Sequence, residues 1–240
     1  MRKLSIAAAC LFLLTASAAG GARVGAPGAI RFDPNKKISQ STSSNWSGYS
    51  AFNGRYTSVS ASWKQPTASC TSATTYSSFW VGLDGYNSST VEQTGTSADC
   101  SGGTPRYYAW YEMYPKFPVN LSLTIQPGDS ISGSVTTDGA GHFTLTLSDT
   151  TTGQSFTTTQ KLPRARLASA EAIAEAPSGS GGVLPLTNFG TVSFTSTMVN
   201  GQAIGAFNPD KIDMYSGSTL KAQTSALSGG TNFSVTWKHS

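Results

Sequence analysis

The side chains of this chain that could do chemistry are carboxyl and amide groups, because histidine and cysteine are scarce. The sequence holds twelve acidic residues and two histidines, His142 and His239. The sequence has no GxSxG motif that would place a nucleophilic serine for a triad with either histidine. The HExxH pattern of zinc peptidases is also absent. The sequence therefore favours acid–base chemistry by carboxyl groups, with no metal and no other cofactor.

Two short stretches each place an acid beside a tryptophan. In FWVGLD, strand alternation puts Trp80 and Asp84 on one face and the apolar residues on the other. In YYAWYEMY, the same alternation groups Trp110 with Glu112. An aromatic face that carries acids is a common build for a ligand cleft. A second hydrophobic layer, with its acids bonded to hydroxyl groups, fits the spacing equally well.

Three further polar residues are candidates for the same chemistry. Gln93 follows the first of these stretches, and its neutral amide offers both a donor and an acceptor. Glu171 and Glu175 are four residues apart, so they share a face in either a strand or a helix. A solvated position on the surface is also consistent with the spacing of all three.

The elements that must position these side chains are predominantly strands. Alternation of apolar and polar residues at 59–63, 143–147 and 233–237 predicts half-buried strands, and turn signals recur between them. Charged residues make up 12% of the chain, about half the usual ~25%, with Ser, Thr and Gly in their place. We therefore predict one all-β domain, a sandwich or barrel. Residues 165–176 are the exception, because their Ala and Glu content favours a short helix.

The N-terminus has the pattern of a signal peptide. Arg2 and Lys3 precede an apolar run over 4–15, and Ala16-Ser17-Ala18 suits a signal peptidase. The run is shorter than the ~20 residues of a membrane span. We predict a signal peptide at 1–18, a linker or short propeptide at 19–40 and the domain at 41–240. The mature protein is then secreted and free of the membrane.

Export determines how the cysteines are interpreted. Cys10 leaves with the signal peptide, so Cys70 and Cys100 remain in an oxidising compartment and are expected to form one disulfide. Their spacing is not that of a metal-binding CxxC pair. The one local group of basic residues, at 161–166, is too short for a nucleic-acid-binding stripe.

Four blocks in series resemble a known family, the glutamic peptidases or eqolisins, and in particular its bacterial secreted members. These blocks are SNWSGY at 44–49, WVGLDG at 80–85 with VEQTG at 91–95, AWYEMYP at 109–115, and AEAIAEAP at 170–177. The resemblance runs from about residue 43 to the C-terminus.

The resemblance implies a fold, an activity and a set of site residues. The fold is an antiparallel β-sandwich of two long, bent sheets, of the jelly-roll or concanavalin-like kind, in which residues 165–176 are extended. The activity is that of an endopeptidase, usually at acid pH, which acts on proteins or peptides. We further expect a monomer. The implied catalytic residues are Gln93 and Glu175, and the residues that line or support the substrate cleft are Trp46, Trp80, Asp84 and Glu112.

The chain departs from the family pattern at two positions, one shortly before each of the implied catalytic residues. Ala172 stands where members often carry an aromatic residue, which puts the packing around Glu175 in question. Glu92 stands where an apolar residue is common. An acid at that position would raise the pKa of neighbouring carboxyl groups if it faced the cleft.

The resemblance predicts a specific mechanism, and two other functions stay open. Glu175 would act as general base on a water, while the Gln93 amide stabilises the oxyanion. A carbohydrate-binding sandwich would instead use Trp80 and Trp110 to stack on sugar rings. A glycoside hydrolase would use two acids, such as Glu112 and Glu175, about 5–9.5 Å apart.

Overall fold

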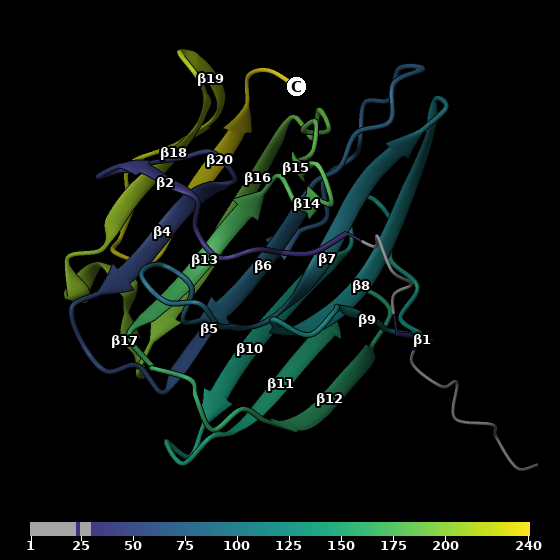
Figure 1. The fold of residues 1–240 in the computed structure, drawn as a ribbon. Helices are drawn as coiled ribbons and strands as arrows, with labels where there is room; N and C mark the ends of the chain where they lie inside the picture. The colour runs from purple at the N-terminus through teal and green to yellow at the C-terminus, as the bar shows by residue number, and fades with distance from the viewer. Residues whose placement is uncertain (1–22, 25–29) are drawn as a thin grey trace, which may run out of the picture.

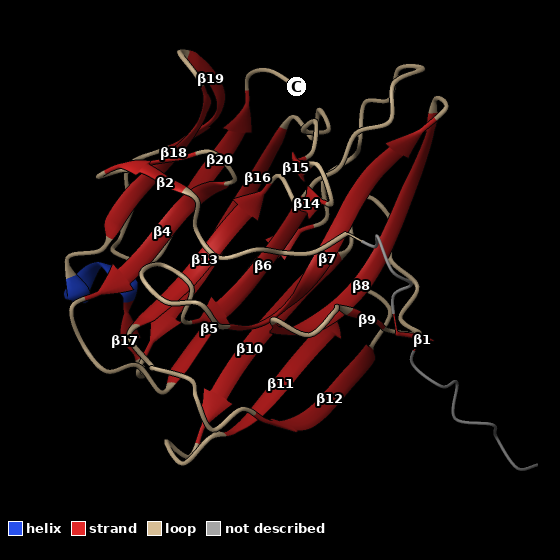
Figure 2. Cartoon of the chain, viewed as in Figure 1, coloured by secondary structure: helices blue, strands red, loops and turns tan. Residues whose placement is uncertain are grey.

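The computed structural model describes residues 23–24 and 30–240. The predicted signal peptide, and the part of the predicted linker at 19–22 and 25–29, lie outside the described residues. Nearly every element is a strand, as Figures 1 and 2 show. The exception among the described residues is a short 3-10 helix, η1, at Ile204–Phe207.

The first sheet carries the candidate site. Each neighbouring pair in it is antiparallel, and β13 lies at its centre, between β4 and β6. In spatial order its strands are β18 (Asp210–Ser216), β4 (Trp46–Phe52), β13 (Ser169–Glu175), β6 (Ser78–Leu83), β7 (Val91–Ser101), β8 (Thr104–Tyr114), β9 (Val119–Asn120) and β1 (Arg23–Val24).

The second sheet lies behind the first in Figure 1. In spatial order its strands are β12 (Gln154–Lys161), β11 (His142–Asp149), β10 (Ser130–Thr137), β5 (Ser58–Lys64), β16 (Thr191–Val199), β20 (Phe233–Trp237), β19 (Thr219–Thr224), β18, β3 (Thr42–Ser43) and β2 (Lys37–Ser39). Two short hairpins complete the strands: β17 (Gln202–Ala203) pairs with β16, and β14 (Ser178–Gly179) pairs with β15 (Gly182–Val183). Because β18 pairs with both β4 and β19, it joins the two sheets.

The main hydrophobic core fills the space between the sheets. Strand alternation directs Val59, Ala61 and Trp63 of β5 into it, together with the apolar face of β6. The indole N–H of Trp63 donates to Thr96 Oγ1 across this space at 3.0 Å. The predicted all-β, antiparallel architecture and its alternating strands are confirmed.

The segment with helix-like composition is the strand β13. Its alanines at 170, 172 and 174 face the main core, and all its residues are buried between two neighbouring strands. The close approach of β4 requires Gly48, which has φ +150°, and a Cβ there would collide with the carbonyl oxygen of Ala172. Tertiary packing therefore overrides helix propensity, and the extended form implied by the resemblance is confirmed.

The expected disulfide is present. Cys70 and Cys100 are bonded, with their Cα atoms 5.4 Å apart, and Cys100 lies in the buried core. The bridge closes a loop whose ends are 30 residues apart in the chain. On the chain-entropy model such a loop stabilises the fold by about 3–4 kcal/mol.

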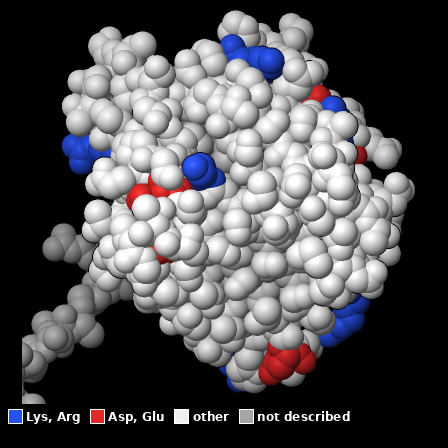
Figure 3. Space-filling model, turned by 180° about the vertical axis from the view of Figure 1, so that it is seen from behind, with Lys and Arg blue, Asp and Glu red and all other residues white. Residues whose placement is uncertain are grey.

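The two histidines lie away from the first sheet's centre. His142 pairs with Asp138 on the surface at 2.7 Å, and His239 is exposed next to the C-terminus. Figure 3 shows charged side chains scattered over a largely uncharged face. Across residues 23–24 and 30–240, no helix is long and apolar enough to cross a membrane, and no group of three or more His, Cys, Asp or Glu side chains could hold a metal ion.

Candidate active site

A second apolar cluster covers the face of the first sheet that points away from the main core. It contains Phe32, Trp46, Trp80, Tyr86, Val91, Trp110, Ile173 and Ile212. In the strand register, Gly95 lies between Trp80 and Trp110. A Cβ at Gly95 would lie 2.5 Å from the Cβ of Trp80, so glycine makes room for the indole rings. The predicted aromatic face therefore exists, and polar groups are set into it.

Gln93 presents its amide from β7 into this aromatic layer. Its Nε2 donates to Oε2 of Glu112, its partner in register on β8, at 2.9 Å. The same Nε2 donates to the carbonyl oxygen of Phe32 at 2.7 Å. Because both partners are acceptors, this end of the side chain must be the NH2 group. The amide oxygen of Gln93 is buried, and no donor among the described residues reaches it.

Glu175 ends β13, opposite Trp46 of β4 in the register. Its Oε2 accepts from Trp80 Nε1 at 2.8 Å, and its Oε1 accepts from Asn45 Nδ2 at 3.3 Å. Burial, followed by the charges of Asp33 and Glu112, raises the pKa of Glu175 well above its usual value, and these hydrogen bonds oppose the rise. The packing concern raised by Ala172 does not materialise, because Glu175 is fully buried among its partners.

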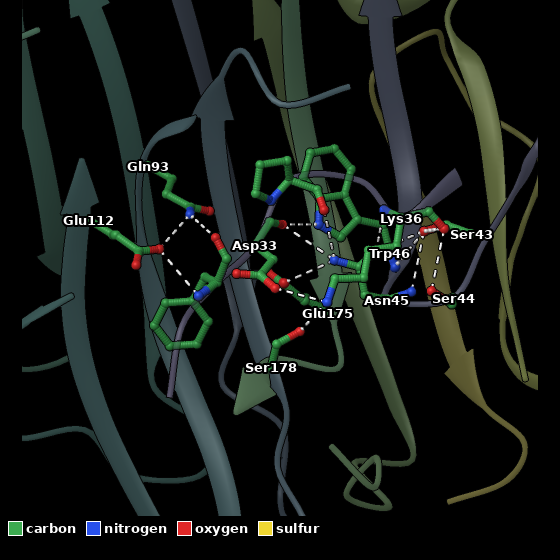
Figure 4. A network of polar contacts seen from close by, with 12 residues as sticks. Asp33, Lys36, Ser43, Ser44, Asn45, Trp46, Gln93, Glu112, Glu175 and Ser178 are labelled. Atoms are coloured by element: carbon green, nitrogen blue, oxygen red, sulfur yellow. Dashed lines mark hydrogen bonds and ion pairs between the residues drawn. The ribbon is translucent and has the colours of Figure 1, made fainter. Parts of the chain in front are cut away.

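The segment at residues 31–36 lies between these two catalytic candidates. The backbone of Arg31 pairs with that of Ser178 through two hydrogen bonds of 2.9 Å. The carbonyl oxygen of Phe32 faces Gln93, and that of Asp33 accepts from Trp46 Nε1 at 3.0 Å. Figure 4 shows Gln93 on one side of Asp33 and Glu175 on the other. Sequence reasoning placed this segment in a linker or propeptide, since it shows no periodicity.

Glu112 orients the groups around the Phe32 peptide. Its Oε2 accepts from the N–H of Phe32 at 3.2 Å as well as from Gln93. Burial raises the pKa of Glu112 well above its usual value, the Asp33 charge adds to the rise, and the hydrogen bonds from Phe32 and Gln93 oppose it. Glu112 therefore fixes the direction in which the Gln93 amide points.

Asn45 is a site residue that sequence reasoning did not assign. Its Nδ2 donates to Glu175 and to the carbonyl oxygens of Asp33 and Pro34, at 3.3, 3.3 and 3.1 Å. The block SNWSGY that carries the resemblance contains it, and that block was the available signal.

Asp84 supports the site from beneath and does not join Gln93 or Glu175. It is fully buried with φ +67°, and its carboxylate accepts three backbone N–H bonds, from Arg166, Leu167 and Ala168, at 2.7–2.8 Å. These residues lead directly into β13. Asp84 therefore anchors the start of the strand that ends at Glu175.

Replacing Asp84 by asparagine is expected to destabilise the fold by about 2–4 kcal/mol. One carboxylate oxygen would become an NH2 group, which cannot accept a hydrogen bond, so at least one of the three backbone N–H groups would lose its charged acceptor. Urea unfolding measures the change. Asp138→Asn, at an exposed acid that accepts from two backbone N–H groups, should lower the midpoint by less than Asp84→Asn does. An Asp84→Asn midpoint equal to that of the unmodified chain would contradict the anchoring role.

Glu171 and Glu92, the other two acids singled out in the sequence, have side chains that make no hydrogen bond to Gln93 or Glu175. Glu171 is buried and accepts from Ser50 Oγ at 3.2 Å, and Gly82 of β6 lies between it and Gln93 in the strand register. Glu92 is in register with Leu83 and Met113, which belong to the main core, so it points between the sheets and not into the cleft. Glu92 therefore does not raise the pKa of carboxyl groups from within the cleft, as it would if it faced that side of the sheet.

A carboxyl group and a side-chain amide that flank a peptide carbonyl supply a proton acceptor and an oxyanion donor, which are the two groups that a glutamic peptidase needs. Residues 44–237 match the Peptidase A4 family, and the chain belongs to that family. It is thus a glutamic endopeptidase, as the resemblance of its four sequence blocks implied.

Related proteins agree in sequence and in fold. The chain is 28% identical over 229 residues to aspergillopepsin-2 of Aspergillus niger, covering 85% of this chain and 80% of the relative. It superposes on scytalido-glutamic peptidase bound to a transition-state analog inhibitor with a TM-score of 0.72 and 28% identity, covering 81% of this chain and 98% of that structure. For aspergilloglutamic peptidase from Aspergillus niger the TM-score is 0.62 at 29% identity, over 68% and 99% of the two chains. The sandwich fold is confirmed by these likenesses.

Proposed function

We propose that this chain is an exported endopeptidase that cleaves peptide bonds at acid pH by direct attack of water, with Glu175 as the base and Gln93 as the oxyanion donor. The observation that carries the proposal is the 2.7 Å hydrogen bond from Gln93 Nε2 to a peptide carbonyl oxygen, that of Phe32. Export rests on the signal-like pattern at 1–18. We further propose that the protein acts as a monomer on protein or peptide substrates.

The proposed reaction starts from a water held between the carboxylate of Glu175 and the amide oxygen of Gln93. Glu175 takes a proton from this water, which attacks the carbonyl carbon of the substrate without forming an acyl-enzyme. The Gln93 N–H stabilises the negative charge that develops on the carbonyl oxygen. Glu175 then returns the proton to the leaving amine, and Glu112 keeps the amide of Gln93 in place throughout.

Acid operation follows from the surroundings of Glu175. Burial is the largest cause that raises its pKa, and the Asp33 charge is the next. Both causes weaken when water enters the cleft and the segment at 31–36 leaves, so the pKa falls toward the ~4.3 of a free glutamate. A carboxylate with such a pKa remains partly ionised in acid, where a histidine base would be protonated.

The carbohydrate-binding and glycoside-hydrolase functions find less support. Trp80 is fully buried and packs edge-on against Trp46, so its ring does not present an open face to a sugar. Glu112 shares its Oε2 with the Gln93 amide, an arrangement that positions an amide donor rather than a free second carboxylate. A solved eqolisin of the same fold is in complex with the tripeptide Ala-Ile-His.

Casein digestion at about pH 3, 5 and 7 tests the proposal, with and without an inhibitor of aspartic peptidases. We expect cleavage in acid that the inhibitor does not affect. Gln93→Ala should reduce the rate by about 10²–10³, the usual cost of losing one oxyanion donor.

Gln65→Ala is the matched control, because Gln65 is also buried and its Nε2 also donates to a backbone carbonyl, that of Ser97, but away from the cleft. It should retain the activity. Equal rates for the Gln93 and Gln65 variants would rule out the proposed oxyanion donor.

A further inference from the structure

The segment at residues 31–36 lies across the site as an extended peptide held by its backbone. The two hydrogen bonds between Arg31 and Ser178 form one antiparallel bridge between the segment and the start of β14. The side chains of Asn45 and Trp46 donate to its next carbonyl oxygens. Backbone pairing of this kind is how clefts along sheets bind extended peptides of varied sequence.

Phe32 is the one residue of the segment whose side chain is deeply bound. Its ring stacks on Trp110 with centroids 3.6 Å apart and planes 14° from parallel, and the residue is 1% exposed. Its neighbours are only partly covered, and Ile38, further along, is 54% exposed. Aromatic stacking makes this position the selective one.

The carbonyl groups of the segment have distinct partners. That of Phe32 accepts from Gln93, while those of Asp33 and Pro34 accept from Trp46 and Asn45. The carbonyl of Arg31 accepts from the backbone of Ser178. The Phe32–Asp33 bond is therefore the one whose carbonyl meets the oxyanion donor.

Charged contacts hold the segment on both sides of this bond. The Arg31 guanidinium lies 4.0 Å from the ring centroid of Phe117. Lys36 Nζ lies 2.9 Å from Oδ2 of Asp33 and 2.9 Å from Ser178 Oγ. Arg31 and Lys36 therefore hold the segment to the domain on either side of this bond, and the Lys36–Asp33 ion pair lies within the segment.

We propose that Trp110 is the platform of the subsite for the residue that precedes the cleaved bond, and that the chain's own Phe32 fills it as an intramolecular substrate. The first bond that the enzyme hydrolyses is then Phe32–Asp33, and its preferred substrates carry an aromatic residue at the same place. This inference rests on the proposed function and adds to it the substrate class and the site of self-cleavage.

The proposed step is an ordinary hydrolysis. Water adds to the carbonyl carbon of Phe32, and the bond from that carbon to the nitrogen of Asp33 breaks. The water oxygen stays in the new carboxyl group of Phe32, and the proton held by Glu175 passes to the new amine of Asp33. Until this step occurs and the product leaves, the cleft is closed to other substrates.

The first test is self-cleavage of the whole chain. The purified protein is held at about pH 3.5, 5 and 7 and followed by intact-mass spectrometry. Burial and the Asp33 charge raise the pKa of Glu175 while the segment is bound, so a larger fraction of the uncleaved chain carries an ionised Glu175 as the pH rises. We expect a cut between Phe32 and Asp33 at a rate that tenfold dilution does not change. Phe32→Gly should slow the cut at least tenfold, while Phe32→Tyr and Ile38→Gly should keep it. Glu175→Gln gives the uncatalysed background.

The second test uses peptides on the self-cleaved enzyme. Peptides of the form Ala-Ala-Arg-X-Asp-Ala-Ala are compared, with X as Phe, Tyr, Leu or Gly. We expect Phe and Tyr to exceed Gly by at least tenfold in kcat/KM. Trp110→Leu should remove most of that preference, and Trp110→Phe should keep it.

The outcomes separate this inference from the proposed function. A chain that digests casein but cuts itself at a different bond, or cleaves the Phe and Gly peptides equally, overturns the subsite and leaves the peptidase in place. A chain whose Glu175→Gln variant cuts itself as fast as the unmodified chain overturns the proposed mechanism, and the inference with it.

Discussion

Glu175→Gln is expected to lower kcat/KM on a peptide substrate by about 10²–10⁴, the range that a positioned general acid–base group contributes. Glutamine preserves the size of the side chain and can still accept from Trp80 Nε1, which now lies 2.8 Å from the carboxylate. It cannot take a proton from water at any working pH. The loss should therefore appear in kcat and leave the fold intact, as judged by near-ultraviolet circular dichroism.

Glu171→Gln is the control, because the two glutamates lie four residues apart on the same face of β13 and are equally buried. Glu171 is bonded to Ser50 and not to a residue of the Gln93 group. We expect this variant to keep the peptidase activity. If both variants lose activity to the same degree, the effect comes from disturbing β13, and the assignment of Glu175 as the base is wrong.

The strands were predictable from the sequence because they obey simple alternation. Val59, Ala61 and Trp63 enter the core while the serines between them do not, and period 2 is the direct consequence of strand geometry. The face that carries Trp80 was predictable for the same reason. The assignment of Gln93 and Glu175 needed the four sequence blocks, because an isolated glutamine or glutamate gives no local signal of burial.

The segment at 31–36 was not predictable, and the reason is physical. Most of its contacts to the domain are made by backbone groups, such as those of Arg31 with Ser178, and any residue except proline offers the same N–H and C=O groups. A stretch held in this way needs no hydrophobic period. The anchoring role of Asp84 was hidden likewise, because it depends on three backbone N–H groups more than 80 residues away in the chain.

Glu92 is a buried acid whose surroundings favour its neutral form. Its two oxygens are buried, and the Asp84 carboxyl and the Thr90 hydroxyl lie beside it. Burial raises the pKa of Glu92 to about 9, and the charge of Asp84 contributes to the rise. The folded protein therefore keeps this proton well above the usual glutamate value of 4.5.

This proton makes stability depend on pH in a definite direction. Below the unfolded pKa near 4.5 both states are protonated, and Glu92 imposes no electrostatic penalty. Between that value and about 9 the folded state binds more protons than the unfolded state, so the free energy of unfolding falls as pH rises. Burial raises the pKa of Glu171 in the same direction. The fold should therefore be most stable in acid.

Glu92→Gln is expected to flatten this dependence, because glutamine is neutral at every pH and nearly the same size. The melting temperature of the unmodified chain should fall steadily from about pH 4 to pH 8, and the variant should fall less, with its largest advantage at the upper end. Scanning calorimetry at matched ionic strength measures both curves. Over this pH range the folded protein keeps the Glu92 proton, because its raised pKa lies above the range. The difference in melting temperature between the two proteins therefore reports the proton that Glu92 releases on unfolding.

Asp138→Asn is the matched control, since it makes the same change from acid to amide at an exposed site. Hydrogen bonds, first that from the N–H of Ala140, hold the pKa of Asp138 below its usual value. Asp138 is therefore ionised in both states above about pH 5, and its loss should not alter the slope there. Parallel melting curves for the unmodified chain and Glu92→Gln would show that Glu92 is solvated or paired. Such a result would also remove the main structural reason for expecting this fold to be most stable in acid.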